Sequence, residues 1–146
     1  MNELGDLYQE TILDNYKHPK NYGALEDATH KAHGDNPLCG DKLVLHLKVK
    51  NGALDDLRFK GLGCAISTAA ASLMTEAVKG RSREEIETLF NKYHAMVTGK
   101  GGAEDLGKLE AFSGVGEFPA RVKCATLCWH TLRAALDGQK EPVSTE

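Results

Sequence analysis

Cys39, Asp41 and Cys64 have the residue types and the neighbours that a metal centre needs. Cys39 and Asp41 flank Gly40, which allows the backbone to turn so that both side chains face one ion. Cys64 follows a Gly-Leu-Gly segment at an expected strand-to-helix junction. At such a junction the backbone N–H groups and the helix dipole favour a thiolate. These positions predict a sulfur-rich site with one carboxylate.

Cys124 is the third candidate sulfur ligand and falls in the first turns of an expected helix, beside the positively charged Arg121 and Lys123. Three thiolates and one carboxylate satisfy the preference of zinc for four tetrahedral ligands, and soft thiolates also accept iron or iron–sulfur clusters. The chain has no C-x₂-C pair, and buried cysteines are common core residues. The spacing alone therefore leaves a metal site and separate buried cysteines as equal alternatives.

Cys128 lies four residues after Cys124 and shares a helix face with it. We interpret Cys128 as a small buried apolar residue and leave it out of the predicted site. A hydrolase with a Cys-His pair would need one special thiol and would leave the other cysteines unexplained. No Ser-His-Asp arrangement can be argued from the sequence.

The composition indicates one ordinary globular domain of 146 residues, 41% hydrophobic and 27% charged. The formal net charge of -3 predicts no nucleic-acid partner, and the absence of a run of about 18 apolar residues predicts no membrane span. The acidic N-terminal segment differs from a signal peptide, so we expect a cytoplasmic protein. In that reducing compartment cysteines serve as ligands or catalytic thiols more often than as disulfides.

The elements expected to position these residues begin with a helix over residues 3–17 and a short edge strand over 29–33. Apolar and polar residues then alternate over 42–50, which predicts a half-buried strand. Asn51-Gly52 is typical of a type I′ hairpin turn, and Leu57 and Phe59 continue on the return strand.

Three further helices follow. One begins near Cys64, and the next opens with Ser82 and Glu85 in capping-box spacing. A long loop over 98–117 contains one short helical turn near 106–112, and the last helix runs from Pro119 to about Asp137. We therefore predict an α+β fold over 1–146, with a small three-stranded antiparallel sheet, helices packed on one face, and a disordered tail over about 138–146.

Three segments carry a resemblance to a known family: NPLCGDKL (36–43), GLGCAISTAAASLMTEAVKG (61–80) and FPARVKCATLCW (118–129). With LYQETILDNYKHPKNYG (7–23), they closely resemble the U-type iron–sulfur assembly proteins, IscU and SufU, over roughly residues 4–137. Lys123 stands where the IscU form has a histidine, and the extra segment near 95–115 is similar to that of the SufU form. The resemblance thus favours the SufU branch of the IscU/NifU N-terminal-like family, with its SufE/NifU-like fold.

The resemblance implies that Cys39, Asp41, Cys64 and Cys124 bind zinc. It further implies a sulfurtransferase-type relay rather than a stand-alone enzyme, in which Cys39 accepts persulfide sulfur from a SufS-like cysteine desulfurase and downstream assembly proteins or apo-proteins receive it. Arg121 and Lys123 are expected to assist docking or to lie around the ligands. The alternatives are a scaffold that holds iron or a transient [2Fe–2S] cluster on the same ligands, and an interaction module with a purely structural zinc.

Overall fold

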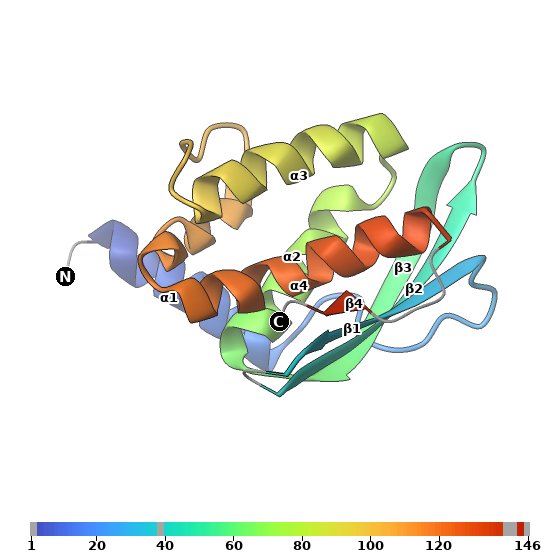
Figure 1. The fold of residues 1–146 in the computed structure, drawn as a ribbon, viewed down its shortest axis with the longest axis horizontal. Coiled ribbons are helices and arrows are strands. Elements are labelled where there is room, and N and C mark those ends of the chain that lie inside the picture. The colour runs from blue at the N-terminus through green and yellow to red at the C-terminus, as the bar shows by residue number, and fades with distance from the viewer. Residues whose placement is uncertain (1–2, 38–39, 139–142, 145–146) are drawn as a thin grey trace.

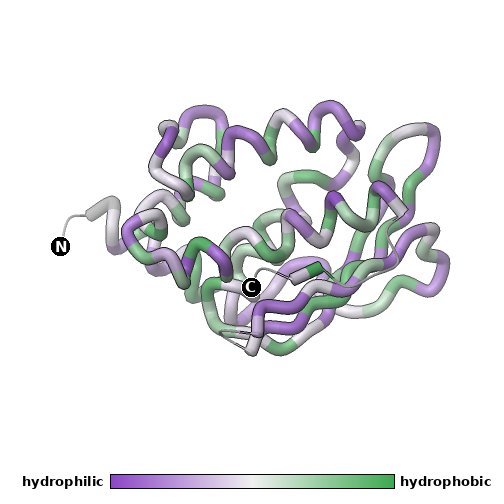
Figure 2. Tube along the Cα trace, viewed as in Figure 1, coloured by the Kyte–Doolittle hydropathy of each residue, from purple (hydrophilic) through white to green (hydrophobic). Residues whose placement is uncertain are grey.

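The strands form where apolar and polar residues alternate. In the computed structural model, which describes residues 3–37, 40–138 and 143–144, strands β2 (Asp41–Lys50) and β3 (Ala53–Leu62) are antiparallel neighbours. Asn51 and Gly52 join them with φ angles of 53° and 78°, as a type I′ turn requires. Figure 2 shows the alternation of hydrophilic and hydrophobic residues along these strands. The predicted hairpin is therefore confirmed.

The sheet has four strands in the order β3-β2-β1-β4, so the prediction of three antiparallel strands is wrong. Strand β1 (His30–Asn36) pairs antiparallel with β2, whereas β4 (Val143–Ser144) pairs with β1 in parallel and makes the sheet mixed. Of the expected tail, the structure describes Gly138 and these two residues of β4. Two residues form too short a strand to leave any periodic signal in a sequence.

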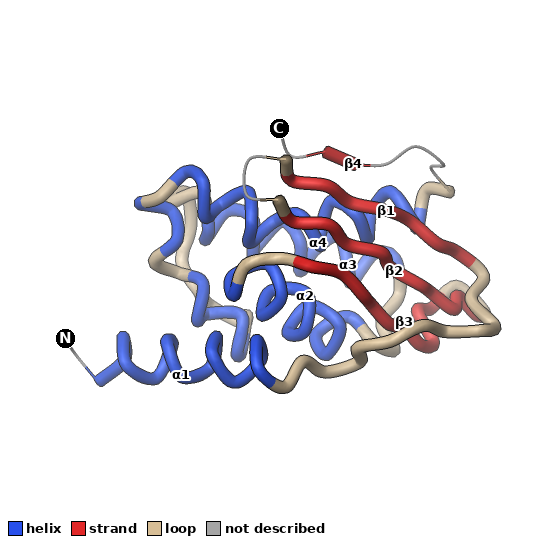
Figure 3. The backbone as a smooth tube through the Cα atoms, turned by 90° about the horizontal axis from the view of Figure 1, so that it is seen from below, coloured by secondary structure: helices blue, strands red, loops and turns tan. Residues whose placement is uncertain are grey.

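The helices cover one face of the sheet in two layers (Figures 1 and 3). Helices α2 (Ala65–Val78) and α4 (Pro119–Leu136) pack directly against the strands, and α1 (Glu3–Lys17) packs on α2. Helix α3 (Arg83–Val97) lies outside α4. The short helices η1 (Gly107–Phe112) and η2 (Val115–Glu117) lie within the predicted long loop. The α+β class, the one-sided helices and the predicted turn near residue 106 are confirmed.

The core between sheet and helices is built on aromatic and leucine side chains. Trp129 and Tyr93 are fully buried and stack with ring centroids 5.2 Å apart. The Tyr93 hydroxyl donates a hydrogen bond to the Ala125 carbonyl at 2.8 Å, which satisfies its polar atom in the core and joins α3 to α4.

Buried polar side chains join α1 to α2. The Ser72 hydroxyl donates to Asn15 Oδ1 at 2.7 Å, and Asn15 Nδ2 donates to the Thr11 carbonyl at 2.9 Å. Asn15 is only 4% exposed, so this amide stabilises the helix pair away from the candidate ligands.

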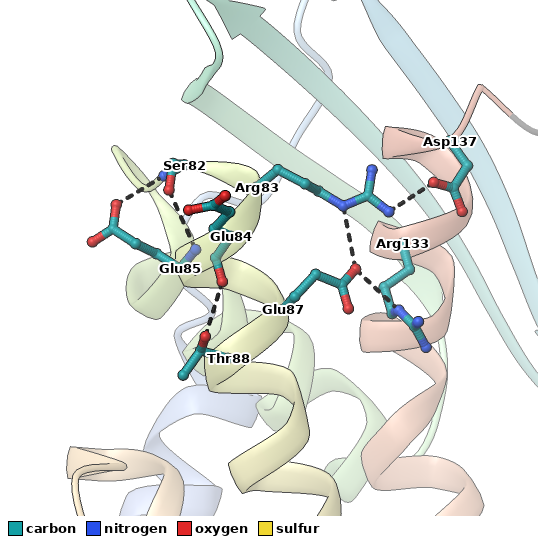
Figure 4. Close-up of polar contacts among 8 residues, drawn as sticks. All are labelled: Ser82, Arg83, Glu84, Glu85, Glu87, Thr88, Arg133 and Asp137. Carbon is teal, nitrogen blue, oxygen red and sulfur yellow. Dashed lines mark hydrogen bonds and ion pairs between the residues drawn. The ribbon is translucent and has the colours of Figure 1, made fainter.

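Helices α3 and α4 are also joined at their solvent edge by charged side chains (Figure 4). Arg83 Nη2 lies 2.7 Å from Asp137 Oδ1, and Glu87 Oε1 accepts from both Arg83 Nε at 3.2 Å and Arg133 Nε at 3.3 Å. The predicted capping box of Ser82 and Glu85 begins α3. None of the helices in the described ranges has the length and apolar character that a bilayer crossing requires.

Candidate metal centre

Asp41, Cys64 and Cys124 converge at one end of the sheet, and we name them the ligand group. One ligand atom from each lies within 4.8 Å of those from the other two. Asp41 and Cys124 are buried, whereas Cys64 is half-buried. Among the residues that the structure describes, no second cluster of His, Cys, Asp or Glu has this geometry. Cys39 lies outside the described residues.

The three ligands come from three different elements. Asp41 is the first residue of β2, Cys64 is the N-cap of α2, and Cys124 lies in the second turn of α4. The N-cap position explains the half-buried sulfur, because an N-cap side chain turns back toward the first N–H groups of its helix. The Ser67 N–H donates to Cys64 Sγ at 3.4 Å, so the sulfur caps the start of α2.

Asp41 is held by hydrogen bonds on both carboxylate oxygens. The Cys64 backbone N–H donates to Oδ1 at 2.9 Å, and Asn36 Nδ2 donates to Oδ2 at 3.2 Å. Gly63 leaves room for this arrangement, since a Cβ atom at that position would lie 3.0 Å from Asp41 Oδ1. A buried carboxylate with 1% exposure needs such donors, because it has lost its hydration.

Asn36 also reaches the third ligand, and sequence reasoning missed it. Its Nδ2 lies 3.5 Å from Cys124 Sγ, within hydrogen-bond range for sulfur, and the side chain is fully buried. Asn36 belongs to the NPLCGDKL segment, but an amide neither titrates nor suits zinc as a ligand. Only the register of β1 against β2, which places Asn36 opposite Asp41, could have indicated its position.

The predicted docking residues, Arg121 and Lys123, lie in the first turns of α4, before Cys124. Arg121 is exposed and places its guanidinium 4.4 Å from the centre of the Phe118 ring, and Lys123 is half-buried on α4. An apolar cavity of about 490 Å³ opens beside Arg121, between α1 and the start of α2. Leu62 is 79% exposed, two residues before Cys64, and Phe118 is 47% exposed at the start of α4. Exposed apolar side chains therefore lie close in sequence to two of the ligands.

Cys128 differs from the cysteines of the ligand group in its surroundings, which are those of the apolar core. It is 1% exposed, and burial raises the pKa of its thiol far above the ordinary value. A thiol of this kind stays protonated and behaves as a small apolar residue. The interpretation of Cys128 as a core residue is confirmed.

Comparisons with known proteins agree on one family. The model of the NifU-like N terminal domain matches residues 7–138. The zinc-dependent sulfurtransferase SufU of Bacillus subtilis is 43% identical over 131 residues, covering 88% of each chain. The iron–sulfur cluster assembly scaffold protein IscU of Thermotoga maritima is 42% identical, covering 93% of this chain and 96% of its own.

A solved structure extends the likeness to three dimensions. The crystal structure of FiSufU from Fervidobacterium islandicum AW-1, described as an iron–sulfur cluster assembly scaffold protein for the SUF system, superposes with a TM-score of 0.82. It is 35% identical and covers 87% of this chain and 94% of its own. Fold, sequence and extent of coverage together assign the chain to the family of the NifU-like N-terminal domain.

Proposed function

We propose that this protein acts in cytoplasmic iron–sulfur cluster assembly as a zinc-dependent sulfur acceptor, with Cys39 receiving sulfur from a cysteine desulfurase. The observation that carries the proposal is the convergence of Asp41, Cys64 and Cys124 within 4.8 Å. The 43% identity to a zinc-dependent sulfurtransferase supports it. In this role the whole chain, 1–146, serves as one domain and relays sulfur in partnership with another enzyme.

The donor chemistry of the ligand group fits zinc. In a tetrahedral site with Zn–S bonds of about 2.3 Å, ligand atoms lie about 3.8 Å apart. The ligand atoms of the ligand group lie within 4.8 Å of one another, so each pair would need to approach by no more than about 1 Å to reach tetrahedral separations. We assign the fourth position to Cys39. Cys39 lies two positions before Asp41 in the chain, and two positions span at most about 7 Å. Bound zinc would supply positive charge that keeps its sulfur ligands as thiolates at neutral pH.

Sulfur transfer to Cys39 needs no external oxidant or reductant. The Cys39 thiolate attacks the outer sulfur of a persulfide on the desulfurase and forms a new S–S bond. The old S–S bond breaks, and its electron pair leaves on the cysteine of the desulfurase as a thiolate. Because one S–S bond replaces another, the oxidation state is conserved and a persulfide on Cys39 is the product. A downstream assembly protein or apo-protein would then take this sulfur.

The surface around the ligand group supports a protein partner. Leu62 and Phe118 are exposed apolar side chains near the ligands in sequence, and Arg121 packs on the Phe118 ring. Exposed aromatic and arginine side chains are enriched at protein interfaces. We assign docking of the desulfurase to this surface, with Arg121 and Lys123 supplying positive charge near the transferred sulfur.

A scaffold for a transient [2Fe–2S] cluster is the second candidate. The 42% identity to an IscU scaffold protein favours it, and thiolates suit iron as well as zinc. Lys123 stands where the IscU form has a histidine, which favours the sulfur acceptor. A purely structural zinc in an interaction module would suit a set of Cys and His better than one that includes Asp41.

Two measurements distinguish these functions. Native mass spectrometry should find one zinc per chain, and addition to a cognate desulfurase with cysteine should raise its turnover strongly. Cys39→Ala should abolish that rise, whereas the matched variant Cys128→Ala should retain it. A cluster-bearing protein after anaerobic reconstitution, with transfer to an apo-ferredoxin and no effect on desulfurase turnover, would support the scaffold instead. Unfolding on zinc removal without any desulfurase response would support a structural zinc.

A further inference from the structure

Asn36 is a fully buried amide at the point where β1 ends, directly opposite the first residue of β2. Its single Nδ2 atom lies 3.2 Å from Asp41 Oδ2 and 3.5 Å from Cys124 Sγ. An amide nitrogen carries two protons, so one proton is available for each of these acceptors. One side chain thus spans a ligand from the sheet and a ligand from α4.

The other end of the same amide explains why its orientation matters. Asn36 Oδ1 is buried and has no hydrogen-bond partner among the described residues. Turning the amide over would place this oxygen against a carboxylate oxygen, which is an acceptor, so the observed orientation is the favourable one. A buried acceptor without a partner is unfavourable for folding. The unpartnered oxygen is offset by the donor that the same amide supplies to the buried Asp41 carboxylate, so the amide serves the ligands rather than its own solvation.

We propose that Asn36 is a positioning residue, which holds Asp41 and Cys124 as a fixed pair of metal ligands through its two amide protons. The inference rests on the proposed function, because it concerns the same metal centre. With the Cys64 N–H on Oδ1 and Asn36 on Oδ2, both carboxylate oxygens are oriented by donors from the protein. Outer donors of this kind orient ligands and tune metal affinity in other metal sites.

Asn36 contacts two of the ligands, Asp41 and Cys124, and these differ in their proposed role from the acceptor thiol of Cys39. Asn36 and Asp41 are paired residues of β1 and β2, so they close the short connection from 37 to 40 that carries Cys39. The amide contacts Asp41 and Cys124, which must stay in place while the proposed acceptor thiol reacts. Asn36 therefore stabilises the part of the site that does not take part in sulfur transfer.

Asn36→Leu tests this role because it removes the donor and also the unpartnered oxygen while keeping the branched shape of the side chain. We expect the metal-free variant to lose some thermal stability, because the buried Asp41 carboxylate loses one of its two donors. Its zinc affinity, measured by competition with a chromophoric chelator, should fall about tenfold to hundredfold. In Co²⁺-substituted protein the ligand-field bands should shift, because the ligand geometry changes.

Asn15→Leu is the matched control, since Asn15 is also a buried amide but lies between α1 and α2. This control should lower thermal stability and leave both zinc affinity and the Co²⁺ spectrum as in the wild type. The inference is overturned if Asn36→Leu binds zinc as tightly as the wild type, or if it loses zinc only in proportion to a loss of fold stability.

The readouts also separate this inference from the proposed function. Wild-type protein that binds no zinc would refute the zinc-dependent function, whereas zinc-binding wild type with an unaffected Asn36→Leu would refute only the role of Asn36. If Asn36→Leu does not fold, Asn36→Ser replaces it. Its hydroxyl has one proton and cannot serve both acceptors, so zinc affinity should still fall by about tenfold. Wild-type affinity in Asn36→Ser would equally overturn the inference.

Discussion

The backbone N–H of Cys64 donates to Asp41 Oδ1 at 2.9 Å, so two members of the ligand group are joined directly by a hydrogen bond. The bond connects the start of β2 to the N-cap of α2, 23 residues later. It uses one of the N–H groups that a helix start leaves without an intrahelical partner. The same contact therefore orients the carboxylate and anchors the helix whose N-cap residue carries the sulfur.

Gly63→Ala should disturb this contact. The added Cβ would lie 3.0 Å from Asp41 Oδ1 and 3.3 Å from Ser67 Cβ, so the carboxylate must move away from the Cys64 N–H. We expect a loss of about 1–2 kcal/mol in the free energy of unfolding and weaker zinc binding. Urea denaturation and chelator competition measure the two effects. Gly102→Ala has open space around its Cβ and should change neither. Unchanged zinc affinity in Gly63→Ala would contradict the prediction.

Gly34→Ala tests the packing of β1 on α4. Its Cβ would collide with the Thr131 hydroxyl and approach Leu127 Cδ1 to 3.1 Å, and both residues lie in α4. Over-packing of this kind costs about 1–3 kcal/mol in unfolding free energy. Thr131→Ala in the same chain should restore part of that loss because it opens the space. A double-mutant cycle from chemical denaturation measures the coupling, and strictly additive losses would show that the two sites do not meet.

Two substitutions compare the apolar and ionic contacts that hold α3 on α4. Phe90 is 5% exposed and lies edge-on to His130, with ring centroids 5.6 Å apart, so Phe90→Ala should cost about 3–5 kcal/mol. Arg83→Ala breaks the pair with Asp137, but both side chains are more than one-third exposed. We expect less than about 1 kcal/mol from Arg83→Ala, decreasing with salt. Equal losses for the two variants in urea denaturation would contradict this, because the ionic contacts would then contribute as much as the apolar ones.

His130 should make stability depend on pH. Burial, with His94 and Arg133 nearby, lowers the pKa of His130 below its ordinary value of 6.5. The unfolded chain therefore binds the proton more readily, and the stabilising contribution is complete above about pH 6.5 and declines as the pH falls. Thermal unfolding between pH 7 and 5 should show this decline, with a smaller slope in His130→Gln. A slope in His130→Gln identical to that of the wild type would exclude His130 as a cause.

Cys128 and Cys64 should differ in reactivity. The raised pKa of Cys128 keeps its thiol protonated, and the thiolate is the form that alkylating agents attack. In metal-free folded protein, iodoacetamide should modify the half-buried Cys64 at least about tenfold faster than Cys128, as peptide mass spectrometry can measure. Both should react at similar rates in denaturant. Rapid labelling of Cys128 in the folded chain would contradict its place in the core.

The helices and the three long strands could be predicted because their signals are local. The alternation over 42–50, Asn51-Gly52 and the capping box of Ser82 act within a few residues of chain, and each is present in the structure. Strand β4 could not be predicted, because Val143 and Ser144 pair with residues more than 100 positions earlier in the chain. A parallel pairing of two residues depends on where α4 ends, which no local pattern records.

The ligands and the positioning residue Asn36 likewise differ in whether the sequence could reveal them. Thiols and a carboxylate can be recognised by residue type, and the predicted convergence of Asp41, Cys64 and Cys124 agrees with their geometry. The place of Cys39 in that set stays a prediction. Asn36 reaches the ligands because β1 pairs with β2 in one register and because it contacts Cys124, 88 residues later. Its residue type alone could not indicate either relationship.

The three ligands lie at positions 41, 64 and 124, so a metal on them would join the sheet to both helices that cover it. None of these elements can leave the others without opening the site. On heating, the metal-bound protein should therefore unfold and release its metal in one transition, and each tenfold excess of free metal over its dissociation constant should add about 1.4 kcal/mol to its stability. The midpoint of heat denaturation would then rise with the concentration of free zinc, so the protein would be less stable to heat where zinc is scarce.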